Sequence, residues 1–183
     1  MKNNLNKIFN FFNIAGGLKR TLRYKASFKI PKESVADHTW RLALMSFMLA
    51  DELKLKINTA KAMQIALVHD LAEAITDDID ALLIHRKVVS PEEKRRLENQ
   101  AIKKLAAVLP RESAKKIVKL WREYIARSSA EAKYVYALDK IEALAYLSEL
   151  GYKTFNDDDK DFVPIYADKA VANFQKLKPV LKI

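Results

Sequence analysis

Two of the three histidines in the chain lie in apolar stretches, where polar residues are least expected. His69 and Asp70 directly follow the apolar run 65–68, Ile-Ala-Leu-Val, and His38 lies about one turn inside another predicted helix. Asp139 interrupts a third apolar stretch, VYALDKIEALAYL. Burying an unpaired carboxylate is costly, so a cation or strong hydrogen-bond donors should lie opposite such a residue. A divalent metal ion would meet this need.

Two imidazoles and two carboxylates make a mixed nitrogen and oxygen donor set, which suits divalent metals such as Mn, Co, Fe, Ni or Zn. The sequence therefore predicts one divalent ion per chain, with Mg also considered, held by His38, His69, Asp70 and Asp139. Simpler explanations stay open, because a lone histidine on an apolar face is usually a core residue and Asp139 can pair with a lysine. His85, the third histidine, is predicted to be a surface or packing residue.

The composition excludes several kinds of site. The 183 residues include no cysteine, so disulfides, thiolate zinc sites, iron–sulfur clusters and a cysteine nucleophile are excluded. The longest apolar run, residues 42–50, is far shorter than the roughly 20 residues that cross a bilayer. The first 17 residues imitate a signal peptide, but Asn10 and Asn13 break their apolar stretch. We therefore expect a cytoplasmic protein that does not bind membranes.

The formal net charge of +10 is concentrated in residues 86–127, where 13 Lys and Arg stand against 5 Glu and leave +8. A positive field favours an anionic substrate. The alternative is a solvated, lysine-rich helical surface, so the function of this segment stays open. No nucleic-acid-binding motif accompanies the charge, and a nucleic acid is not an expected partner.

The sequence predicts that the segments carrying the candidate metal ligands are helices. Only 3 glycines and 5 prolines occur, and half of the residues are hydrophobic, which predicts a single all-α domain. Helix-capping residues and prolines predict where the helices begin and end. The first expected helix begins after Ser34, and the second runs from Asn58 through Ile75. The third begins after Ser90 and the fourth after Pro110. The fifth begins after Ser129 and runs to Leu150, and the last runs from Asp161 to Leu177.

The order of His38, the doublet His69-Asp70 and Asp139 resembles the H…HD…D signature of the HD-domain metal-dependent phosphohydrolases. Three blocks, ESVADHTWRLALMS, ALVHDLAEAITDDI and LWREYIARSSAEAKYVYALDKIEAL, look like the 5′-deoxynucleotidase branch. The resemblance runs from about residue 18 to residue 150. It implies an all-α HD-domain helical bundle over residues 1–183, with its motifs within 34–150 and a metal site in its centre.

The implied activity is hydrolysis of (deoxy)nucleoside 5′-monophosphates by a metal-dependent 5′-nucleotidase. The expected partners are the nucleotide substrate and further copies of the chain, in a homodimer or a higher homo-oligomer. The preferred base and the choice between deoxyribose and ribose are left open.

Two acidic residues after the HD doublet have implied catalytic roles. On a continuous helix Glu73 lies roughly 40° from His69 and 60° from Asp70, between the two ligands. In the resembled enzymes the matching Glu orients or deprotonates the attacking water, and the Asp matching Asp78 lies by the leaving oxygen. The alternative for Glu73 is an exposed helix residue. The family's usual T-G-D reads Thr-Asp-Asp at 76–78 here, and loss of the glycine can alter the turn that presents Asp78.

Arg23 and Tyr24 are the predicted substrate-binding residues. Arg23 stands 15 positions before His38, where the resembled nucleotidases place an arginine that holds the substrate phosphate. A guanidinium can bind phosphate oxygens through two hydrogen bonds. Tyr24 occupies the place where a bacterial relative has a tryptophan against the sugar. The frequent W-x-E-Y-E motif departs only at its end, reading WREYI over residues 121–125.

Other functions are weighed against this one. Cyclic-nucleotide phosphodiesterases and dinuclear-iron oxygenases of this superfamily use additional histidines, and only His85 is left over. Alarmone hydrolases place an acidic pair after the HD doublet, whereas Glu73 is followed by Ala74. A helical module that binds a nucleotide without hydrolysing it is the alternative from another class.

Overall fold

The computed structural model describes residues 2–25, 33–150, 168 and 172–182. The helices in this part of the chain confirm the all-α prediction, and the only strand-like pairing there is one bridge between Leu22 and Ser34. No helix among the described residues is long and apolar enough to cross a membrane. The α-helices are α1 (Lys2–Ala15), α2 (Val35–Glu52), α3 (Thr59–Val68), α4 (Glu73–Thr76), α5 (Ala81–His85), α6 (Pro91–Ala107), α7 (Arg111–Ala126) and α8 (Ala130–Glu149), and the 3₁₀ turns are η1 (Gly16–Lys19), η4 (Gln175–Leu177) and η5 (Val180–Lys182).

Local capping explains where four of these helices begin. At the start of α2 the backbone N–H of Asp37 donates to Ser34 Oγ at 3.1 Å, and the N–H of Ser34 donates to Asp37 Oδ2 at 3.0 Å. This reciprocal pair is a capping box. Helices α3, α6 and α8 each begin with a cap in which a side-chain oxygen accepts a hydrogen bond from the backbone N–H three residues later. Asn58 accepts from Lys61, Ser90 from Glu93 and Ser129 from Ala132. The predicted starts of these four helices are thereby confirmed.

The predicted continuous helix from Asn58 through Ile75 is wrong, because α3 ends at Val68 and α4 begins at Glu73. Between them Leu71 N–H donates to Val68 O at 3.2 Å, and Glu73 N–H donates to Asp70 O at 2.9 Å. Bonds to the third preceding residue wind the chain more tightly than an α-helix. The rotation of 100° per residue therefore does not carry across this turn.

Other predicted bounds were less complete. Helix α8 ends at Glu149 with Leu150 as its C-cap, close to the prediction, while Gly151 lies outside the described residues. Most of the expected helix over 161–177 also lies outside them, and its described end is the 3₁₀ turn η4. Helices α1 and α5 were not predicted.

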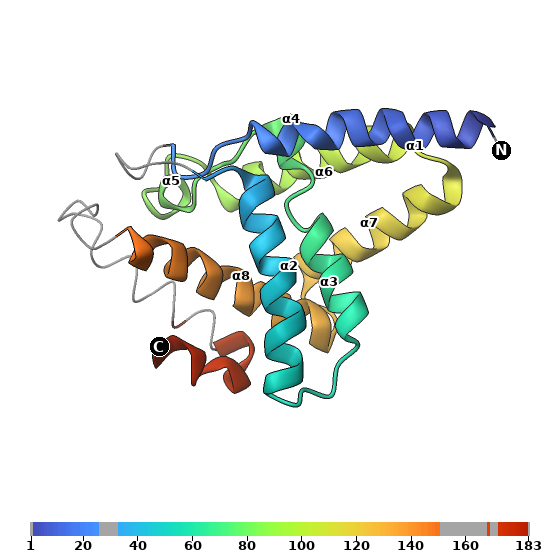
Figure 1. Ribbon diagram of the computed structural model, residues 1–183. Helices are drawn as coiled ribbons and strands as arrows, with labels where there is room; N and C mark the ends of the chain where they lie inside the picture. Colours follow the sequence, from blue (N-terminus) through green and yellow to red (C-terminus); the bar gives the residue numbers. More distant parts are fainter. Residues whose placement is uncertain (1, 26–32, 151–167, 169–171, 183) are drawn as a thin grey trace. The chain divides into compact units, whose positions relative to one another are not determined.

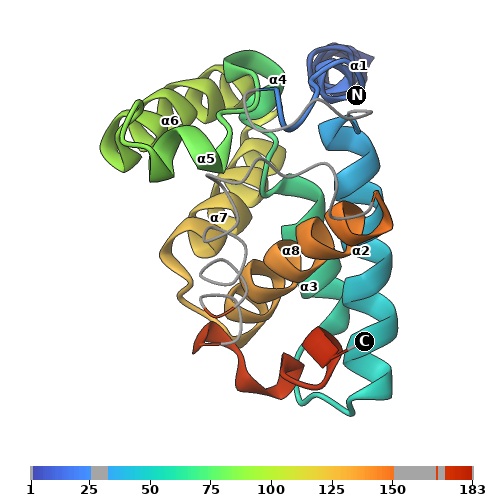
Figure 2. The same ribbon diagram turned by 90° about the vertical axis from the view of Figure 1, so that its left-hand side faces the viewer.

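The chain divides into two compact units. The first comprises residues 1–27, 32–37 and 68–122, and in it α4 lies between α1 and α6 (Figure 2). A Cβ on Gly17 would lie only 3.1 Å from Ala74 O, so the glycine permits η1 to approach α4 closely. Thr21 Oγ1 also donates to Glu73 O at 3.3 Å. These contacts hold the loop after η1 against the start of α4.

The second unit comprises residues 28–31, 38–67 and 123–183, and in it α8 crosses α2 (Figure 1). Tyr134 of α8 is fully buried, and its hydroxyl donates to Ser46 O of α2 at 3.1 Å. Its ring packs 5.3 Å from that of Phe174. The buried face of α8 continues through Val135 and Leu138 to Asp139. A carboxylate is therefore held in the interior of this unit.

Candidate metal centre and reaction site

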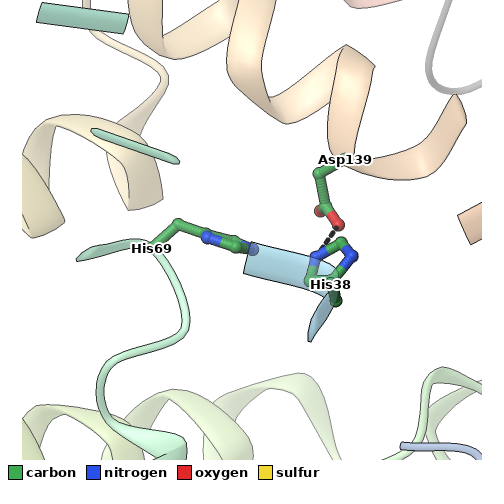
Figure 3. Close-up of side chains that lie close together, drawn as sticks. All are labelled: His38, His69 and Asp139. Carbon is green, nitrogen blue, oxygen red and sulfur yellow. Dashed lines mark ion pairs between the residues drawn. The ribbon is translucent and has the colours of Figure 1, made fainter. Parts of the chain in front are cut away.

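His38 and Asp139 form a buried pair within the second unit (Figure 3). His38 is fully buried as the fourth residue of α2, and Asp139 is 4% exposed on α8. Nε2 of His38 lies 3.3 Å from Oδ1 of Asp139. Two ligand atoms that each lie about 2.0–2.2 Å from one ion are about 2.8–3.1 Å apart in octahedral coordination and about 3.3–3.6 Å apart in tetrahedral coordination. The pair therefore fits two adjacent positions around a metal ion.

The second oxygen of Asp139 has protein partners. The Tyr124 hydroxyl donates to Oδ2 at 2.8 Å, and Lys140 Nζ donates to it at 2.6 Å. The lysine pairing considered for Asp139 thus exists, but it engages the oxygen that does not lie nearest His38. Tyr124, from the WREYI motif, was not predicted to contact a ligand. The carboxylate is held in orientation by these two donors, with Oδ1 towards the imidazole.

His69 and Asp70 lie in the first unit, in the turn after α3. The His69 side chain is fully buried, that of Asp70 is 23% exposed, and Nε2 of His69 lies 2.9 Å from Asp70 Oδ2. His69 is drawn with His38 and Asp139 in Figure 3, and all three are buried side chains of a type that ligates metals. The doublet therefore lies where the helix is interrupted, with the His69 side chain buried and that of Asp70 partly exposed.

Glu73 begins α4 and is only 4% exposed, so the alternative of an exposed helix residue is wrong. Burial raises the pKa of Glu73 well above its ordinary value, and the charges of Asp70 and Asp78 act in the same direction. Burial also raises the pKa of Asp78. The positive charges of Lys94 and Arg23 act in the opposite direction on both pKa values, but the net shift of each is upward. The first unit thus gathers these acidic and basic groups into one electrostatic cluster.

Lys94 of α6 is the cation at the centre of that cluster, and it was missed from the sequence. Its Nζ lies 3.6 Å from Glu73 Oε1 and 3.5 Å from Glu98 Oε1, and it donates to Ile79 O at 3.2 Å. Burial by itself lowers the pKa of Lys94, but the surrounding carboxylates, Glu73 first, outweigh burial and raise it. For Lys94, the hint of a partner in the sequence was Glu98, four residues later on the same helix. For this residue the interpretation as a solvated surface lysine is wrong.

Arg23 and Tyr24 lie in the loop after η1, in the first unit. Arg23 is 9% exposed, and its Nη1 lies 2.6 Å from Glu33 Oε1. Its guanidinium carbon lies 4.8 Å from the centre of the Tyr24 ring, and Tyr24 is also buried. Together with its effect on the pKa of Glu73 and Asp78, this places the Arg23 charge beside the acidic cluster.

The turn before Asp78 keeps a backbone conformation that favours glycine, although the residue there is Asp77. Its φ is 63° and its ψ is 168°, a region costly for residues with a side chain, by about 1–3 kcal/mol. Asp77 also forms an ion pair with Lys25. Asp78 follows with a half-buried side chain. Asp77 therefore adopts a positive φ that a glycine would adopt without strain. His85, on α5, is exposed as predicted.

Comparisons with known proteins agree with this geometry. The HD domain family model matches residues 15–177. The 5′-deoxynucleotidase HDDC2 of Homo sapiens is 36% identical over 144 residues, covering 78% of this chain and 67% of that protein. The Bos taurus protein of the same name is 39% identical over the same shares. The crystal structure of the PH0347 protein from Pyrococcus horikoshii OT3 has a TM-score of 0.74 at 28% identity, covering 95% of this chain and 96% of that one.

The family match extends over both units and includes every residue of the predicted metal site. The Homo sapiens and Bos taurus relatives are more than 30% identical over most of the chain, and both are 5′-deoxynucleotidases. The chain therefore belongs to the HD-domain metal-dependent phosphohydrolases and is related to the 5′-deoxynucleotidases of that family.

Proposed function

We propose that this protein is a metal-dependent 5′-deoxynucleotidase, which hydrolyses deoxynucleoside 5′-monophosphates to a nucleoside and phosphate. The observation that carries the proposal is the buried pair of His38 and Asp139, whose nearest atoms are 3.3 Å apart. That spacing fits ligands of a single ion, in a chain whose curated relatives are 5′-deoxynucleotidases.

The proposed centre holds one divalent ion per chain. His69 and Asp70 complete the ligand set in the proposal, which the full burial of His69 and the HD doublet support. Neutral imidazoles and carboxylates suit Mn, Co, Fe, Ni or Zn. A divalent ion there would lower the pKa of a coordinated water and polarise a phosphoryl oxygen.

The acidic residues of the first unit would handle the protons. In the proposed reaction the water oxygen forms a bond to phosphorus, the bond from phosphorus to the 5′ oxygen breaks, and the Glu73 carboxylate accepts the water proton. Asp78, in its protonated form, donates a proton to the departing 5′ oxygen. Lys94, 3.6 Å from Glu73, would oppose protonation of the base before the reaction.

Arg23 would bind the substrate phosphate, and Tyr24 would pack against the sugar. Arg23→Ala is expected to raise KM for nucleoside monophosphates and to leave metal content intact, because the guanidinium would contact phosphate rather than the ion. Hydrogen bonds to charged groups contribute about 1.5–3 kcal/mol, so kcat/KM should fall by roughly 10- to 150-fold. Steady-state kinetics with elemental analysis of the same sample measures both quantities.

Arg20→Ala is the matched control, because Arg20 is an exposed arginine of the same loop. Its kcat/KM should stay within about twofold of wild type. An Arg23→Ala protein that loses its metal would contradict the assignment to phosphate.

A phosphate-release assay tests the function itself. The protein, stripped with a chelator and then reloaded with single metals, is offered deoxynucleoside 5′-monophosphates, ribonucleoside 5′-monophosphates and 3′-monophosphates. Release from the 5′-deoxynucleotides that requires added metal is the expected result. Release only from alarmones or cyclic nucleotides would move the protein to another HD activity, and binding without release would identify a non-catalytic module.

Self-association stays a prediction. Among the described residues, α2 presents apolar side chains at helical spacing that are 42–66% exposed: Trp40, Leu44, Phe47 and Met48. Exposed apolar patches often mark protein contacts. We expect this face to be covered in the predicted homodimer or higher homo-oligomer.

A further inference from the structure

Glu142 is a buried carboxylate that the proposed reaction does not use. It stands one turn after Asp139 on α8 and is fully buried. Its Oε2 contacts Nδ1 of His38, and its Oε1 accepts from Arg41 Nε at 2.7 Å. All four residues belong to the second unit. A fully buried carboxylate is retained at a cost unless such partners compensate it.

The contact with Glu142 decides which nitrogen of His38 can bind a metal. A neutral imidazole carries one N–H donor and one acceptor nitrogen. Because Nδ1 faces the Glu142 carboxylate, which only accepts, the proton lies on Nδ1. Nε2 then keeps its lone pair, and this is the nitrogen that lies 3.3 Å from Asp139 Oδ1.

Arg41 holds Glu142 in place. Its Nη2 donates to the backbone carbonyl of Glu142 at 3.3 Å, and its Nη1 donates to both carboxylate oxygens of Glu149 at 3.0 and 3.1 Å. Arg41 stands three residues after His38 on α2, so the two residues that contact the Glu142 carboxylate lie on the same face of that helix. The Arg41 guanidinium thus binds two residues of α8, Glu142 and Glu149, and these contacts hold the Glu142 carboxylate in place.

We propose that Glu142 is a positioning residue for the metal centre: it fixes the tautomer and the ring orientation of His38 through Nδ1, and Arg41 in turn fixes Glu142. The inference rests on the proposed function, because it requires His38 to be a ligand. Such outer partners of metal-binding histidines typically change metal affinity by about 10- to 100-fold.

The test is metal affinity, measured by competition with a chelator for Zn²⁺ and Mn²⁺. The change Glu142→Gln keeps the shape of the side chain, but the new amide N–H₂ must face either the N–H of His38 or that of Arg41. Glu142→Gln should therefore raise the metal dissociation constant by about 10- to 100-fold, while kcat at saturating metal changes less than about threefold. Glu149→Gln removes a 63% exposed partner of the same arginine and should leave metal affinity within about twofold.

Metal affinity in a folded Glu142→Gln protein within twofold of wild type would overturn the inference. If that variant fails to fold, Arg41→Gln decides, because it leaves the carboxylate facing His38 and removes only its anchor. A weaker metal affinity in Arg41→Gln supports the inference, and an unchanged affinity overturns it. Failure of the proposed function is distinguishable, since wild-type protein would then bind no metal or release no phosphate.

Discussion

Glu73→Gln is expected to lower kcat by about 10²- to 10⁴-fold, while metal content and substrate affinity change little. The substitution keeps the shape of the side chain and removes the charge that would accept the proton of the attacking water. Glu73 is buried, and Lys94 lies 3.6 Å from its carboxylate. A group so enclosed acts on the reaction through its charge and basicity, so the loss should fall on the chemical step.

Single-turnover hydrolysis of a deoxynucleoside monophosphate at saturating metal, together with equilibrium binding of the substrate, separates these quantities. Glu98→Gln is the matched control, because Glu98 is another carboxylate beside Lys94, with Oε1 at 3.5 Å from Nζ. It should keep most of the wild-type rate. If Glu73→Gln kept more than about half of that rate, Glu73 would be a bystander and Asp78 the leading candidate for handling the water.

The free energy of unfolding of the metal-free protein, measured as a function of pH, checks that Glu73→Gln is folded. The pKa of Glu73 is higher in the folded metal-free protein than its ordinary value, so the folded state binds this proton more tightly than the unfolded state. The free energy of unfolding therefore decreases as pH rises from the ordinary pKa towards the raised one. A glutamine does not ionise, so metal-free Glu73→Gln should be at least as stable as wild type at neutral pH.

Asp139→Ala is expected to reduce the metal content from about one ion per chain to near zero, and to reduce activity to that of chelator-stripped wild type. The substitution removes the oxygen that lies 3.3 Å from His38 Nε2. Asp70→Ala should have the same effect, and its partly exposed side chain makes a folding defect less of a concern. Elemental analysis of the purified variants measures the occupancy.

Tyr124→Phe is the control for Asp139, because it removes a hydrogen bond to Oδ2 and leaves both carboxylate oxygens in place. It should retain metal. Normal metal content in both the Asp70 and the Asp139 variants would remove these residues from the ligand set.

The sequence alone determined the starts of four helices, α2, α3, α6 and α8, and the chemical types of the candidate ligands. A cap such as Ser34 with Asp37 is a contact between residues three positions apart, so local spacing specifies it. Similarly, His69 and Asp139 are recognisable because a polar residue in an apolar stretch demands a partner, whatever the tertiary structure.

The partners were decided only by the tertiary structure. His38 and Glu142 stand 104 positions apart, and Glu73 contacts Lys94 from another helix, so no local spacing connects them. The tight turn after Val68 also has no glycine or proline to announce it. Buried charges must be compensated wherever the fold brings opposite charges together. Which charge compensates which is therefore a property of packing, and it appears only when distant helices meet.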